Sequence, residues 1–145
     1  MRENNQGARE GESKLALIID TRFLIAHTFP PSIEDKKRIE RFTARILKEK
    51  LLVPNIVVVE YIKIAGRRIG KEAAKTRLNL WRNIGVEIVS LTEELSFKAG
   101  ELALKHPQIP LADTMIATIA SKHNARIVTD DHHYNILGAK TLWYK

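Results

Sequence analysis

Three acidic residues of the sequence come directly after apolar runs that predict buried strands. Asp20 follows residues 15–19, and Asp130 and Asp131 follow residues 125–129. In a parallel sheet, ligand sites form beyond the carboxyl ends of the strands, at the point where the strand order reverses. We therefore expect these carboxylates to lie together if the two strands are neighbours.

Two more acidic residues are placed to join this group from helices. Asp113 opens the strongly helical block 111–123, and Glu60 interrupts the otherwise apolar stretch 57–62. A buried carboxylate requires a hydrogen-bond partner or a metal, so we expect Glu60 to have one.

A cluster of carboxylates without cysteine would favour one class of cation. Neighbouring carboxylates repel one another unless protons or a cation neutralise them, and the chain has no cysteine. Oxygen ligands without thiolates select Mg²⁺ or Mn²⁺ before Zn²⁺. Such an ion can activate a water for attack on phosphorus and stabilise the leaving oxygen.

Each acidic position also has a purely structural explanation. Asp20 could cap a helix that follows it, and Asp113 could be an N-cap or a partner of the helix dipole. Asp130 and Asp131 could be turn residues. Their shared placement at the carboxyl edge of one sheet favours a functional site.

Short apolar strands alternate with helices along the chain. Strands are predicted at residues 15–19, 51–53, 86–89, 125–129 and 141–143. Helices are predicted at about 33–47, 56–65, 70–84, 92–105 and 111–123, with a short turn or helix at 133–137. This alternation predicts an α/β fold with three α/β/α layers, a parallel sheet of about five strands and right-handed crossovers.

Local signals mark the starts of two helices. Ser32, with an acidic residue three positions later, is the predicted N-cap of the first helix. Asn55 is the predicted N-cap of the second, which should end near Gly66. The first helix carries an apolar stripe that consists of Ile33, Ile39, Phe42, Ile46 and Leu47.

A chain of 145 residues suits a single domain, which we place at residues 15–145. Residues 1–14 are polar and aperiodic, and we predict a disordered N-terminal tail there. The sequence shows neither an apolar run of membrane-spanning length nor the apolar stretch of a signal peptide. With the absence of cysteine, this favours a cytoplasmic protein that has no membrane partner.

The net charge of +7 lies on the predicted domain, because residues 1–14 carry three basic and three acidic residues. A basic domain suits a phosphate backbone, and plain solubility is the alternative explanation. Many of the bases form one series, which consists of Lys63, Arg67, Arg68, Lys71, Lys75, Arg77 and Arg82. Lys63 and Arg67 fall on the helical face of Glu60, so they could hold RNA or simply face solvent.

Spacing disfavours other kinds of chemistry. The histidines lack metal-ligand spacing, and two of them are adjacent, so their side chains should diverge. They are His27, His106, His123, His132 and His133. No glycine-rich phosphate loop occurs, and Trp81 and Trp143 are expected to fill core or dimer contacts.

Four segments of the chain resemble, in order, the acidic motifs of PIN domains. They are Asp20-Thr21-Arg22-Phe23-Leu24, Val59-Glu60, Leu111-Ala112-Asp113 and Val128-Thr129-Asp130-Asp131. The resemblance spans residues 15–143, and its opening motif is especially similar to archaeal, VapC-like members. By position, the resemblance implies an acidic cluster around Mg²⁺ or Mn²⁺ that is formed by Asp20, Glu60, Asp113 and Asp131.

The last motif leaves one ligand open. The family pattern Thr-x-Asp puts its acid at Asp131, while Asp130 takes a variable position that also faces the site. Thr129 would support the site through its hydroxyl group.

The resemblance also implies an activity and partners. It implies a metal-dependent endoribonuclease that hydrolyses RNA phosphodiester bonds, frequent homodimers and, for VapC-type toxins, inhibition by a small antitoxin protein. Lys63, Arg67 and Arg68 would then bind RNA. The alternatives are a non-catalytic PIN-like module that binds RNA or protein, and an RNA-processing nuclease that is not a toxin.

Overall fold

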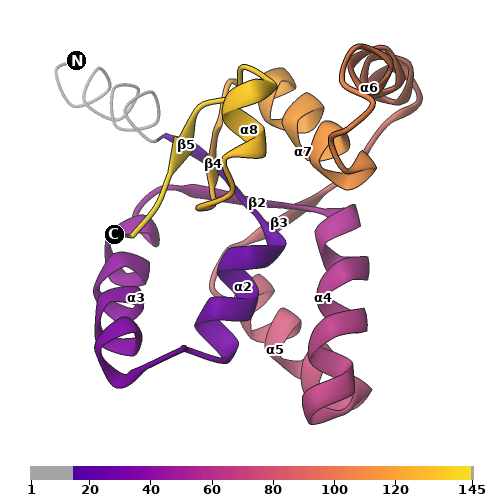
Figure 1. Ribbon diagram of the computed structural model, residues 1–145. Coiled ribbons are helices and arrows are strands. Elements are labelled where there is room, and N and C mark those ends of the chain that lie inside the picture. The colour runs from indigo at the N-terminus through magenta and orange to yellow at the C-terminus, as the bar shows by residue number, and fades with distance from the viewer. Residues whose placement is uncertain (1–14, 145) are drawn as a thin grey trace, which may run out of the picture.

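The centre of the fold is a five-stranded sheet in which every neighbouring pair of strands is parallel. A computed structural model describes residues 15–144 (Figure 1), and the tail predicted at residues 1–14 lies outside the described residues. The strand order is β3-β2-β1-β4-β5. The strands are β1 (Ala16–Ile19), β2 (Lys50–Pro54), β3 (Glu87–Val89), β4 (Arg126–Val128) and β5 (Thr141–Leu142). The predicted α/β class and parallel sheet are thus confirmed.

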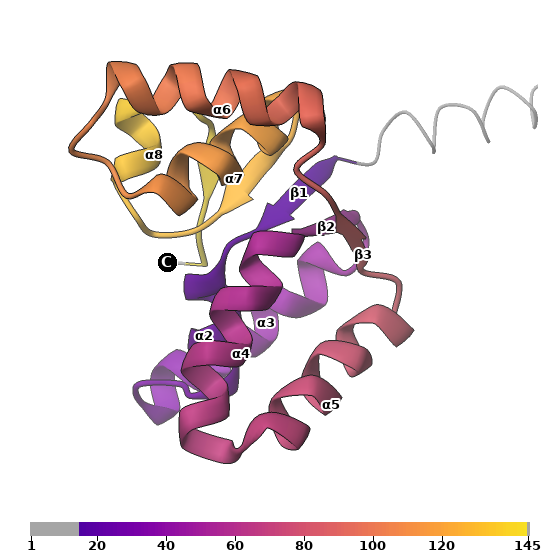
Figure 2. The ribbon, with the colours of Figure 1, turned by 90° about the vertical axis from the view of Figure 1, so that its right-hand side faces the viewer.

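Helices lie on both sides of this sheet. They are α2 (Thr21–Thr28), α3 (Ile33–Ile46), α4 (Asn55–Ile69), α5 (Lys71–Asn83), α6 (Glu93–Lys105), α7 (Leu111–Lys122) and α8 (His133–Ile136). Figures 1 and 2 show α2 to α5 on one side of the strands and α6 to α8 on the other. This arrangement gives the predicted three layers. No helix within residues 15–144 is long and apolar enough to cross a membrane.

The strand order reverses at β1. The chain passes from β1 through β2 to β3 on one side, then returns to place β4 on the other side of β1. Strands β1 and β4 pair in register, with Ile19 opposite Val128. Both residues are fully buried, as apolar runs covered on two faces predict. The carboxyl ends of β1 and β4 therefore meet at the reversal, the place where such sheets bind ligands.

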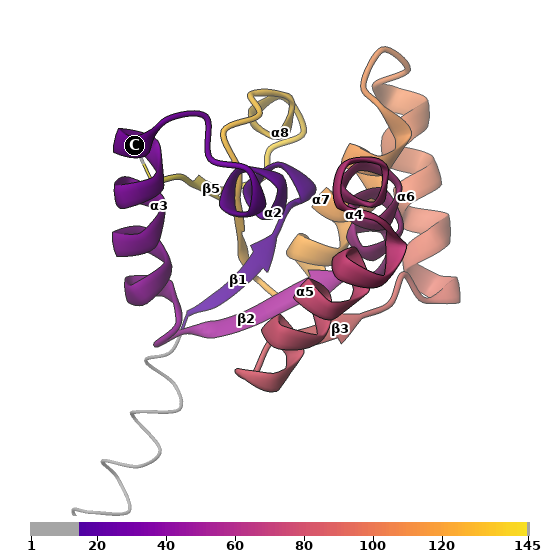
Figure 3. The ribbon, with the colours of Figure 1, turned by 90° about the horizontal axis from the view of Figure 1, so that it is seen from below.

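Helix α2 is an element that the apolar pattern did not predict by itself. It has eight residues, and its N-cap is Asp20, whose carboxylate accepts a hydrogen bond from the Thr21 backbone N–H. Phe23 and Leu24 anchor the helix in the core. Figure 3 shows β1 leading directly into α2. Asp20 thus caps the helix that follows it, as the structural explanation of this residue predicted.

Two helices differ in detail from their predictions. Ser32 caps α3 through the Asp35 N–H as expected, but Ile33 and Leu47 are 75% and 42% exposed, because they lie at the ends of the predicted stripe. The cap predicted for α4 is wrong: Pro54 is the N-cap residue, without a side-chain hydrogen bond. Helix α4 also continues past Gly66 to Ile69, and its C-cap is Gly70, whose φ of +89° lies outside the helical region.

Candidate metal centre at the carboxyl edge of the sheet

Asp20 is the most buried carboxylate at this edge, with 4% of the residue exposed. Its Oδ1 accepts from the Thr21 N–H at 2.8 Å and its Oδ2 accepts from the Thr129 hydroxyl at 2.7 Å. The Tyr134 hydroxyl donates to Oδ1 at 3.3 Å. Burial, together with the charge of Asp113, raises the pKa of Asp20 to about 6 despite the hydrogen bonds from Thr129 and Thr21.

Asp113 enters the same network from the first turn of α7. Its Oδ1 accepts from the Tyr134 hydroxyl at 3.4 Å, and its Oδ2 lies 3.1 Å from the His133 Nδ1. Burial, and after it the charge of Asp131, raises the pKa of Asp113 above its ordinary value. The N-cap of α7 is Pro110, so Asp113 is not the cap, but its position in the first turn does suit the helix dipole.

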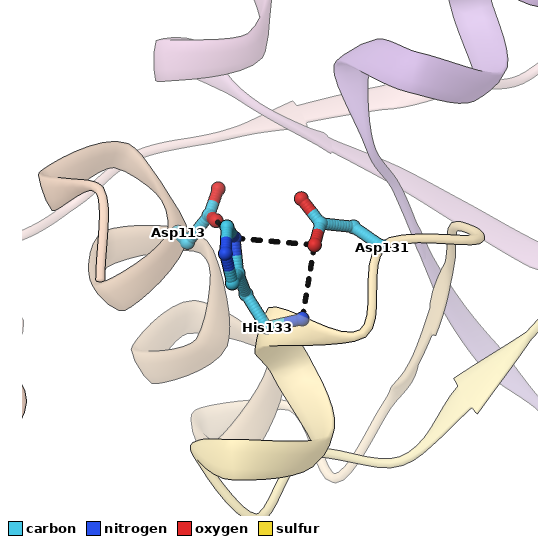
Figure 4. A group of neighbouring side chains, drawn as sticks. All are labelled: Asp113, Asp131 and His133. Atoms are coloured by element: carbon cyan, nitrogen blue, oxygen red, sulfur yellow. Dashed lines mark hydrogen bonds and ion pairs between the residues drawn. The ribbon is translucent and has the colours of Figure 1, made fainter. Parts of the chain in front are cut away.

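Asp131 faces Asp113 from the loop after β4. The Thr129 hydroxyl accepts from the Asp131 N–H at 3.1 Å, and Asp131 Oδ1 accepts from the His133 N–H at 2.9 Å. The same Oδ1 lies 3.2 Å from His133 Nδ1. Asp113, Asp131 and His133 each offer one ligand atom, and these atoms lie within 4.8 Å of one another (Figure 4).

Asp130 points to a different partner from its neighbour. Its Oδ1 lies 2.6 Å from the Arg22 Nε, and the two side chains are 35% and 56% exposed. Successive side chains at an extended strand end point to opposite sides. Of the two adjacent acids, Asp131 is therefore the one that the structure brings to Asp113.

Glu60 reaches this edge only indirectly. Its Oε1 accepts from the Thr21 hydroxyl at 2.7 Å, and the Thr21 N–H in turn donates to Asp20. The residue is only partly buried, which corrects the expectation of an acid enclosed by apolar side chains. Positions 57 and 61 of α4 face the core, whereas position 60 lies beside them. The expected partner exists, and it is a hydroxyl group.

His133 and Tyr134 are site residues that the sequence reasoning missed. Adjacent side chains are expected to diverge, but the ring centroids of His132 and His133 lie only 4.9 Å apart, with His132 exposed and His133 turned towards Asp113. Tyr134 is fully buried, and burial raises the pKa of its hydroxyl. The sequence held one signal for His133. It follows Asp131 by two residues, the spacing at which an aspartate side chain accepts a hydrogen bond from a backbone N–H.

The basic residues of α4 divide into two kinds. Lys63 and Arg67 are exposed and make no hydrogen bond or ion pair with any residue that the structure describes. Arg68 has its guanidinium carbon 3.7 Å from the centre of the Phe29 ring, which is a cation–π contact. Trp81 is buried beside Phe23, and Trp143 packs against the same ring, in agreement with a core role.

The donor set fits a divalent cation. Burial and mutual repulsion raise the pKa values of Asp20 and Asp113, and a cation beside them would relieve that repulsion. Asp113 and Asp131 offer carboxylate oxygens, and His133 adds a ring nitrogen. Asp20 is linked to this group through Tyr134 and Thr129.

Comparisons with known proteins agree with this architecture. The family model described as "PIN domain" matches residues 17–139. A search of curated proteins finds no match. Among solved structures, VapC20 of Mycobacterium tuberculosis, a toxin that cleaves the sarcin–ricin loop, aligns with a TM-score of 0.73 and 18% identity over 87% of this chain and 98% of that one.

Two solved complexes show the same fold. A chain of VapBC2 of Rickettsia felis, bound to a DNA fragment from its promoter, aligns with a TM-score of 0.71 and 18% identity over 89% of this chain and 98% of that one. A chain of FitAcB of Neisseria gonorrhoeae aligns with a TM-score of 0.65 and 17% identity over 88% of this chain and 96% of that one. At identities this low, the alignments establish similarity of fold alone.

Proposed function

This chain belongs to the PIN domain family, and we propose that it is a metal-dependent endoribonuclease that hydrolyses RNA phosphodiester bonds. The observation that carries the proposal is the network joining Asp20, Asp113 and Asp131 where the strand order reverses. PIN domains are typically magnesium-dependent nucleases, and this carboxylate cluster is the donor set that such an ion requires.

Each residue of the network has a distinct part in this proposal. Asp113 and Asp131 hold the ion directly, and Asp20 completes the acidic pocket from the end of β1. Thr129 positions two of them, because its hydroxyl donates to Asp20 and accepts from the Asp131 N–H. A bound Mg²⁺ or Mn²⁺ would activate the attacking water and stabilise the leaving oxygen.

Residues around the network have supporting parts. Glu60, joined to Asp20 through Thr21, is the fourth carboxylate and orients water or the ion from the α4 side. Asp130, paired with Arg22, lies at the rim. Lys63 and Arg67, exposed farther along α4, bind the RNA backbone, and Arg68 contributes to the same basic face.

We extend the proposal to partners on the basis of the structural neighbours. Solved complexes of this fold include VapBC and FitAB assemblies bound to DNA, and a toxin–antitoxin complex of Klebsiella pneumoniae. By analogy, this chain is a VapC-type toxin that forms a homodimer and is inhibited by a small antitoxin protein. An RNA-processing nuclease without an antitoxin is the second possibility.

Cleavage of a labelled RNA by the purified protein tests the activity. Fragments should form with Mn²⁺ or Mg²⁺ and disappear with EDTA, and Asp113→Asn should reduce the rate by about a hundredfold. Glu94→Gln is the control. It makes the corresponding change from carboxylate to amide on the exposed first turn of α6, and this variant should cleave RNA at the normal rate. RNA binding without metal-dependent cleavage would identify a non-catalytic module instead.

A further inference from the structure

We infer that His133 is a metal ligand, so that the centre has a mixed nitrogen and oxygen donor set and prefers a first-row transition ion such as Mn²⁺ to Mg²⁺. The inference rests on the proposed function, since it concerns the ion of the same site. It reverses the sequence-based expectation that the histidines bind no metal.

The position of the imidazole supports this role. His133 Nδ1 lies 3.1 Å from Asp113 Oδ2 and 3.2 Å from Asp131 Oδ1. Neighbouring ligand atoms around a six-coordinate ion with bonds of about 2.1 Å are separated by roughly 3 Å. In Figure 4 the ring lies against Asp113, and a dashed line joins it to Asp131 across from them, so the Nδ1 is within reach of both carboxylates.

An ion satisfies this arrangement better than a proton does. Ionised carboxylates only accept hydrogen bonds, and one Nδ1–H can point directly at only one of the two oxygens. A cation among the three atoms would contact all of them. The ring would then present its lone pair at Nδ1 and carry its proton on Nε2.

The backbone holds the histidine in place for this contact. His133 begins α8, and its N–H donates to Asp131 at 2.9 Å, so the ligand residue and the imidazole are held by the same short turn. The next residue, Tyr134, is buried, and its hydroxyl lies 3.4 Å from Asp113 and 3.3 Å from Asp20, so that its single proton is shared between the two carboxylates. The His133 side chain is itself 32% exposed, which leaves the site open to an ion from solution.

The choice of ion follows from the nitrogen. Mg²⁺ binds almost entirely through oxygen, whereas imidazole suits transition ions, whose affinities for nitrogen and oxygen sites rise from Mn²⁺ towards Cu²⁺. Oxygen ligands alone suit Mg²⁺ and Mn²⁺ alike. Replacing the nitrogen with oxygen should therefore weaken Mn²⁺ binding relative to Mg²⁺ binding.

Electron spin-echo envelope modulation of bound Mn²⁺ tests the ligand directly, because coupling to ¹⁴N reports a coordinated histidine. The wild type and His132→Ala, the adjacent exposed control, should show the coupling; His133→Ala and His133→Asp should not. The Kd for Mn²⁺, measured by calorimetry, should rise about tenfold or more in His133→Ala. In His133→Asp, the ratio of Mn²⁺ affinity to Mg²⁺ affinity should fall by a similar factor.

The outcomes separate this inference from the proposed function. Mn²⁺ that binds the wild type, is lost in Asp113→Asn and shows no ¹⁴N coupling would overturn the histidine ligand while leaving the carboxylate centre intact. Coupling that persists in His133→Ala would overturn it equally. A wild type that binds neither Mn²⁺ nor Mg²⁺ would overturn both proposals.

Discussion

The carboxyl edge of the sheet and the basic face of α4 both consist of charged residues, but the chain builds them differently. At the sheet edge, Asp20, Asp113 and Asp131 each have at least two close polar partners and lie largely out of solvent. On α4, Lys63 and Arg67 stand in solvent without a partner among residues 15–144.

The two regions therefore constrain their residues to different degrees. A charge removed from water needs specific partners, so the geometry of the sheet edge is determined by several elements at once. A solvated charge can be moved or replaced at little cost in stability. Substitutions at the sheet edge should therefore change stability, pH dependence and metal binding together, whereas those of Lys63 and Arg67 should act on RNA affinity alone.

Asp20 should make the stability of the protein strongly dependent on pH. Its folded pKa of about 6 exceeds its ordinary value of 3.8, so between these values the folded state binds a proton that the unfolded state lacks. Its contribution to the free energy of unfolding is therefore present at about pH 4 and lost as pH rises through 6, by about 3 kcal/mol for two pKa units.

Urea unfolding of the wild type and Asp20→Asn in EDTA measures this contribution. The variant should gain stability relative to the wild type between about pH 4 and about pH 7. A difference between the two proteins that stays constant with pH would show that the Asp20 carboxyl is not destabilised by burial.

Metal binding should separate the two regions next. At an ion concentration of about a hundred times Kd, a ligand of the native state stabilises it by about 2.7 kcal/mol, which raises Tm by several degrees. Asp20→Asn combined with Asp113→Asn should abolish the effect of Mn²⁺ on Tm. Lys63→Ala combined with Arg67→Ala should preserve it, and the opposite pattern would place the ion elsewhere.

A smaller effect is expected when the basic face is changed. If Lys63 and Arg67 each contact a phosphate, their replacement by Ala should weaken binding to every RNA sequence and reduce the slope of log K against log salt by roughly 1.4. Fluorescence anisotropy at several salt concentrations measures the slope. Lys98→Ala with Lys105→Ala, on exposed positions of α6, is the control. Equal slopes in both double variants would mean that this face of α4 does not bind RNA.

The smallest effect concerns Arg68, which the structure engages with Phe29. Arg68→Ala should lower the free energy of unfolding by about 0.5–1 kcal/mol, because a partly exposed cation–π contact is lost. Chemical denaturation measures the free energy of unfolding of this variant and of Phe29→Leu, which removes the same contact from the other side. Unchanged stability in both variants would show that the contact with Phe29 does not stabilise the fold, and that Arg68 resembles the solvated Lys63 and Arg67.

The sequence predicted the parts of the fold that depend on local patterns. Apolar runs predicted all five strands, and Ser32 caps α3 where it was expected, whereas the cap predicted at Asn55 was wrong. The position of Asp20 and Asp131 beyond neighbouring strands followed from the parallel topology. These features could be predicted because each depends on a few consecutive residues and on one rule of sheet connection.

Other parts depended on contacts between distant segments. The roles of His133 and Tyr134 arise only because α8 packs beside the start of α7, some twenty residues earlier in the chain. The exposure of Glu60 depends on the rotation of α4 against the sheet, which the valines around it did not reveal. Helix α2 has only eight residues, too few to show a clear helical period of apolar residues. Its N-cap, Asp20, is also a residue of the candidate site.

Asp130 and Asp131 directly test the metal centre at Asp113 and Asp131, since the same substitution at adjacent positions should have unequal effects. Single-turnover cleavage of one RNA at saturating Mn²⁺ should fall by about a hundredfold or more in Asp131→Asn, which loses a ligand of the ion. In Asp130→Asn, which loses only an exposed pair with Arg22, the rate should change little. Equal activity of the two variants, or a greater loss in Asp130→Asn, would contradict the assignment of the centre to Asp113 and Asp131.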